Sequence, residues 1–72
     1  MKELFSEWAD LQARRSAAAL NKTSKVEHLA KEIEILENLL ANGFYNIPGE
    51  NRDVRSILEN RQQQRREMQK RE

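Results

Sequence analysis

The chain contains no cysteine and only one histidine, His28, among its 72 residues. These absences exclude a disulfide and leave no basis for a structural zinc site of the usual Cys/His type. The sequence also lacks a glycine-rich phosphate loop and a serine placed beside a second histidine. We therefore predict a protein that is not an enzyme and that holds no metal or cofactor.

Proline and glycine are scarce as well, with one proline and two glycines, whereas 35% of the residues are charged. Few chain breakers and many charged residues favour solvent-facing helices over strands. Long hydrophobic runs are missing, so we expect neither a signal peptide nor a membrane-spanning segment. The sequence predicts an all-α protein, a single helical domain over residues 1–72, located in the cytosol.

The clearest pattern is an apolar stripe in the middle of the chain. Five apolar side chains recur at steps of three and four residues, which places them on one helix face: Val26, Leu29, Ile33, Leu36 and Leu40. Ser24 and Glu27 match a capping box at the start of this stripe, and Asn42 and Gly43 match a helix stop at its end. We predict a helix over residues 24–41.

The segment before it, residues 2–20, is predicted to be a first helix because it contains good helix formers and neither proline nor glycine. Its short connection to the middle helix favours an antiparallel hairpin, in which Trp8 and Leu11 cover the apolar stripe. Arg15 lies in the middle of the covering face, where an unpaired charge would be costly. We expect Arg15 to reach the rim or pair with a glutamate, or else to bind an anion.

Residues 42–50 combine turn-forming residues with three large side chains, Phe44, Tyr45 and Ile47. Solvent-exposed loops rarely contain several large apolar or aromatic residues close together. We expect Phe44 and Ile47 to fold back onto the open end of the hairpin. The alternative is an exposed recognition loop.

A third helix is predicted over residues 52–70. Asn51 is suited to cap it, and Asp53 in its first turn suits the positive end of the helix dipole. The apolar face of this helix ends at Leu58, so its last third has little to bury. We predict an antiparallel helical hairpin plus a third, partly projecting C-terminal helix.

The middle helix also carries apolar residues on the side opposite its main stripe. Ile35 and Leu39 lie there with His28, and Glu32 follows His28 by about one turn. Two interpretations are open: the third helix covers Ile35 and Leu39, or these residues stay exposed and form a dimer or partner surface. From the second alternative we predict a partner or oligomer interface that contains His28, Glu32, Ile35, Leu39, Val54, Ile57 and Leu58.

The C-terminal segment, residues 61–72, contains five basic and two acidic side chains and no aromatic residue. Arginine and lysine contact phosphates, whereas the missing aromatics leave nothing for base stacking. A solvated or oligomer-forming arm is the alternative to nucleic-acid binding here. The candidate anion or nucleic-acid contacts are Arg15, Arg61, Arg65, Arg66, Lys70 and Arg71.

Taken together, these patterns predict a small protein–protein interaction module that acts by helix-face contacts. A chain this short buries a small share of its surface, and without disulfides or metals we expect it to form a homo-oligomer, most simply a dimer. Another protein is a further expected partner. The alternatives are a small nucleic-acid-binding protein that uses the basic arm and a binder of small anions or nucleotides centred on Arg15.

Overall fold

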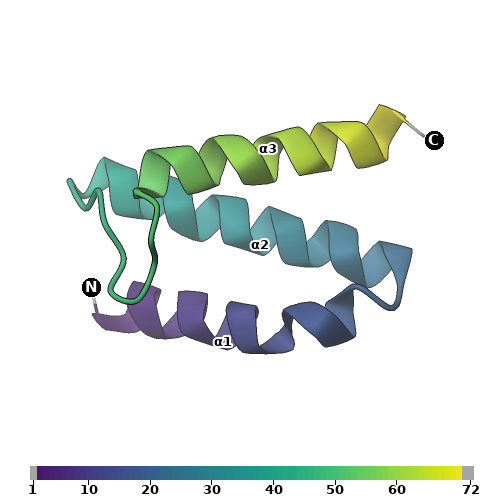
Figure 1. Ribbon diagram of the computed structural model, residues 1–72, viewed down its shortest axis with the longest axis horizontal. Coiled ribbons are helices and arrows are strands. Elements are labelled where there is room, and N and C mark those ends of the chain that lie inside the picture. The colour runs from purple at the N-terminus through teal and green to yellow at the C-terminus, as the bar shows by residue number, and fades with distance from the viewer. Residues whose placement is uncertain (1, 71–72) are drawn as a thin grey trace.

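The computed structural model describes residues 2–70, including the side chains of residues 3–69. Its helices are α1 (Lys2–Ala18), α2 (Lys22–Ala41) and α3 (Val54–Lys70), and no strand occurs among the described residues (Figure 1). The predicted all-α class is therefore confirmed. Within the described part of the chain, every helix falls short of the length and apolarity that crossing a membrane requires.

Helix α2 is the centre of the bundle, because both α1 and α3 pack against it. Figure 1 shows α2 between the other two, with each neighbour running antiparallel to it. The last third of α3 runs past the first turns of α2, where Gln64 and Met68 border Lys25, and residues 65–67 and 69 are exposed there. The backbones of α1 and α3 do not contact each other. The side chains of Trp8 on α1 and Arg61 on α3 meet in the space between them.

The ends of the first two helices differ from the sequence prediction. Helix α1 ends at Ala18, and α2 begins at Lys22 because the Asn21 side chain accepts hydrogen bonds from the backbone N–H groups of Thr23 (2.8 Å) and Ser24 (3.3 Å). The predicted capping box at Ser24 is therefore wrong. The predicted stop is confirmed, since α2 ends at Ala41, Asn42 is its C-cap residue and Gly43 then adopts the left-handed conformation (φ 81°).

The core surrounds α2 near its C-terminal end, and the connection between α2 and α3 closes it. Ile47 is buried there, and the half-buried Phe44 meets the ring of Phe5 edge-to-face at 5.7 Å between centroids. The prediction that Phe44 and Ile47 fold back onto the hairpin is confirmed. Tyr45 is 60% exposed, but its carbonyl accepts a hydrogen bond from the Val54 N–H (2.8 Å) and so ties this connection to α3.

Asp53, rather than the predicted Asn51, caps α3. Its carboxylate accepts a hydrogen bond from the backbone N–H of Ser56 at 3.2 Å, three residues into the helix. Hydrogen bonds from the side chain and the backbone of Ser56 hold the pKa of Asp53 below its usual value of 3.8. The ionised carboxylate is therefore the form that the folded helix prefers.

This cap predicts a pH-dependent contribution to stability. Because the folded-state pKa of Asp53 lies below its unfolded value, the ionised cap stabilises the fold above about pH 4 and this contribution is lost as the pH falls through the folded-state pKa. Asparagine caps a helix about as well but carries no charge. Urea unfolding should therefore show wild type to be more stable than Asp53→Asn near neutral pH, with the gap closing as the pH falls through the lowered folded-state pKa of Asp53. A gap of constant size would contradict this assignment.

Candidate interaction surface

The side chains predicted from sequence to form an exposed interface lie inside the protein. Ile35, Leu39, Val54 and Ile57 share one core with Trp8. His28 and Glu32 are buried as well, and Leu58 is half-buried against the same core. Six of the seven predicted interface residues are therefore buried within the chain itself and Leu58 is half-buried against its core, because α3 packs on α2. This corrects the prediction of an exposed interface and agrees with the alternative, in which the third helix covers Ile35 and Leu39.

A buried carboxylate, Glu32, joins the three helices. Its Oε2 accepts hydrogen bonds from Nε2 of Gln12 on α1 (2.7 Å) and from Nε of Arg61 on α3 (3.1 Å). The Glu32 side chain is fully buried and that of Arg61 is only 11% exposed. The ion pair therefore neutralises a charge that burial would otherwise make very unfavourable.

Aromatic and polar contacts extend this arrangement toward the α2–α3 connection. The Arg61 guanidinium lies over the Trp8 ring, with Cζ 5.8 Å from the ring centroid. The Trp8 Nε1–H donates a hydrogen bond to Oε2 of Glu50 (2.7 Å), so Trp8 ties α1 to the segment between α2 and α3. Arg61 is thus a structural residue, and the prediction that places it in an exposed basic arm is corrected.

His28 and Glu32 lie one turn apart on α2, with Nε2 of His28 3.7 Å from Oε1 of Glu32. Neither of these two atoms has a hydrogen-bond partner among the described residues. A metal site would need further ligands, and no cluster of three or more histidine, cysteine or acidic side chains occurs within residues 2–70. The two side chains are therefore buried neighbours on α2, and Glu32 makes its hydrogen bonds through its other carboxylate oxygen, Oε2, to Gln12 and Arg61.

The remaining basic candidates lie on the surface or outside the described part. Arg15, Arg65 and Arg66 are exposed. The apolar-face position predicted for Arg15 does not bury it, because the second half of α1 is largely uncovered and residues 13–17 are all exposed. The side chain of Lys70 and the whole of Arg71 lie outside the described residues.

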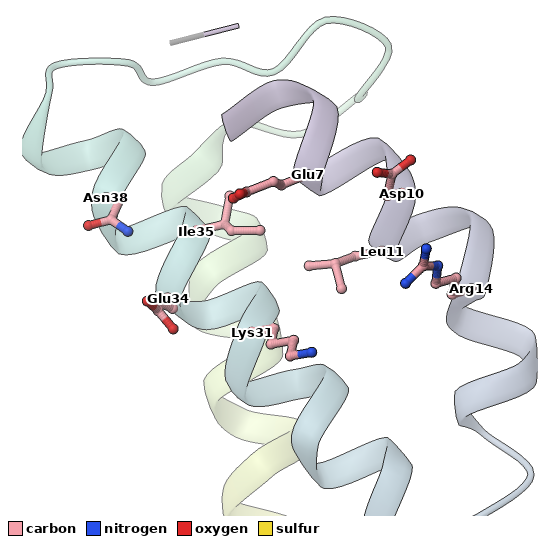
Figure 2. A pocket seen from close by; sticks show the side chains of 8 residues that line it. All are labelled: Glu7, Asp10, Leu11, Arg14, Lys31, Glu34, Ile35 and Asn38. Carbon is pink, nitrogen blue, oxygen red and sulfur yellow. The ribbon is translucent and has the colours of Figure 1, made fainter. Parts of the chain in front are cut away.

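A groove of about 330 Å³ runs between α1 and α2 (Figure 2). The half-buried Leu11 and the buried Ile35 form its apolar floor, and Figure 2 shows both side chains extending into the space between the two helices. Its rim consists of six exposed polar residues: Glu7, Asp10, Arg14, Lys31, Glu34 and Asn38. Sequence reasoning missed this surface, which we call the α1–α2 groove, because its two walls come from different helices.

The charges along the α1–α2 groove are ordered by sign. Because the helices are antiparallel, the acidic residues Glu7, Asp10 and Glu34 lie toward one end, and Arg14 and Lys31 lie toward the α1–α2 joint. In the part of the chain that the structure describes, none of these five side chains forms an ion pair with another. The α1–α2 groove therefore presents an acidic end and a basic end to whatever contacts it.

Comparison of the chain with protein-family models, with curated proteins and with solved structures finds no match.

Proposed function

We propose that the protein is a helical interaction module that binds a protein surface through the α1–α2 groove. One observation carries this proposal: an apolar floor, Leu11 and Ile35, is surrounded by exposed charged side chains that do not pair with one another among the described residues. Protein interfaces are commonly built in this way, with an apolar centre and a polar rim. A partner would cover the floor and supply the counter-charges.

The distribution of basic residues supports this proposal over nucleic-acid binding. The buried Glu32 already neutralises Arg61, which removes one cation from the basic arm. Arg65 and Arg66 are exposed, but the hollow that they line also contains the acidic Glu37. An acidic side chain beside two arginines weakens the attraction to phosphates on which such binding depends.

Site-specific photo-crosslinking tests the proposed function. A photoreactive amino acid in place of Asp10, on the rim of the α1–α2 groove, should give a discrete protein adduct in the cells that produce the protein. The matched control is the same amino acid in place of Ser16, which is also exposed on α1 but does not line the groove. Adducts are compared on denaturing gels and identified by mass spectrometry. No protein adduct at Asp10, or equal adducts at both positions, would contradict the proposal.

A further inference from the structure

We propose that the occupant of the α1–α2 groove is a second copy of the same chain, an inference that rests on the interaction function proposed above. The order of charges carries it. A surface with an acidic end and a basic end is complementary to itself when one copy is turned end for end. The α1–α2 groove has this property, because on each helix the acidic residue lies farther from the α1–α2 joint than the basic one. Asp10 and Arg14 are this pair on α1, and Glu34 and Lys31 are this pair on α2.

The charges also select one of two symmetric arrangements. A twofold axis that lies in the interface and crosses the helices at right angles reverses their direction, so each acidic end meets the basic end of the other copy. A twofold axis parallel to the helices keeps their direction and brings like charges together, which is unfavourable. The first arrangement places α1 antiparallel to α1 of the second copy and α2 antiparallel to α2 of the second copy.

The spacing of the charged residues is consistent with a single axis. Asp10 and Arg14 are four residues apart, so an axis that crosses α1 at Gln12 brings Asp10 opposite Arg14 of the second copy. Lys31 and Glu34 are three residues apart, so the matching crossing point on α2 lies beside Glu32. These two crossing points face each other in the structure, since Gln12 donates a hydrogen bond to Glu32 at 2.7 Å.

One axis therefore forms two kinds of intermolecular ion pair, each made twice by symmetry. One kind joins Asp10 to Arg14, and the other joins Lys31 to Glu34. Leu11 and Ile35 lie beneath these pairs, and docking of the second copy buries the part of Leu11 that is still exposed, since Ile35 is already buried. The result is an antiparallel four-helix core made of two α1–α2 hairpins, with α3 of each copy behind α2.

Sedimentation equilibrium on the full chain, from about 1 µM to about 1 mM, tests this dimer. Wild type should dimerise. Arg14→Asp and Asp10→Arg should each weaken the dimer at least about tenfold, because each places like charges opposite one another twice. The double variant Asp10→Arg with Arg14→Asp should restore dimerisation, because the ion pairs re-form with their signs exchanged.

The matched control is Arg15→Asp, which makes the same change on the neighbouring exposed residue of α1 but outside the groove. Arg15→Asp should leave the dissociation constant of the dimer unchanged. Circular dichroism should show equal helicity in all the variants. A monomer over the whole concentration range would overturn the proposal, as would a dimer that is insensitive to Arg14→Asp. A monomer that still forms an adduct with a different protein at Asp10 would overturn the dimer and support the interaction function, so the two proposals fail separately.

Discussion

Replacing Glu32 with alanine should lower the free energy of unfolding by about 3 to 5 kcal/mol. The variant leaves the Arg61 guanidinium in a mostly buried position without its counter-charge, and it removes the acceptor for Gln12. A protein of this size has a total stability of about 5 kcal/mol, so the variant should retain at most about 2 kcal/mol and unfold at a much lower urea concentration. Urea unfolding, followed by circular dichroism and by the fluorescence of the single tryptophan, measures the change.

The control for this prediction removes both charges together. When a buried ion pair is replaced by apolar side chains of similar volume, the effect on stability is often close to neutral. The double variant Glu32→Leu with Arg61→Met should therefore be more stable than Glu32→Ala. A loss below about 1 kcal/mol for Glu32→Ala would mean that the pair behaves like a surface ion pair, which contradicts its burial.

The sequence predicted the helices because their signals are local. The stripe from Val26 to Leu40 recurs within one segment, and Gly43 stops the helix by a backbone preference of its own. The errors at the starts of α2 and α3 are of one kind. Several nearby residues were able to cap each helix, and only the folded backbone shows that Asn21 and Asp53 do so.

The buried contacts of Glu32 with Gln12 and Arg61 were harder to predict because these three residues are far apart in sequence. Glu32 and Arg61 are separated by 29 residues, and each also fits a solvent-exposed helix face when its own segment is considered alone. The position of Arg61 did carry a usable signal, since it lies one turn after Ile57 on the face that α3 buries. Its partner depends on how α3 packs against α2, which periodicity within one helix does not determine.

The α1–α2 groove was missed for a related reason. Glu7, Asp10 and Arg14 recur at helical spacing on α1, a pattern that marks a polar face but not what lies beside it. Only the packing of α1 on α2 adds Lys31 and Glu34 to that face and orders the charges by sign. Arg15 is exposed, which agrees with the expectation that it reaches the rim, but the cover implied by its apolar-face position is missing from this half of α1.

Replacing Leu39 with alanine should lower the free energy of unfolding by about 2 to 5 kcal/mol. Leu39 is fully buried in the core that contains Trp8, Ile47 and Val54, so the shorter side chain leaves a cavity that its neighbours fill only in part. The matched control is Leu20→Ala, since Leu20 is 89% exposed at the α1–α2 joint. That variant should change stability by less than about 0.5 kcal/mol.

The protein concentration at which these variants are compared separates a core residue from an interface residue. A core residue stabilises each copy by itself, so the loss for Leu39→Ala should be the same at low and high concentration. An interface residue acts through association, so its effect on unfolding would grow with concentration. Urea unfolding of Leu39→Ala and Leu20→Ala at two protein concentrations about a hundredfold apart therefore shows whether Leu39 acts within one copy or between copies. A concentration-dependent loss at Leu39 would return it to the interface predicted from the sequence.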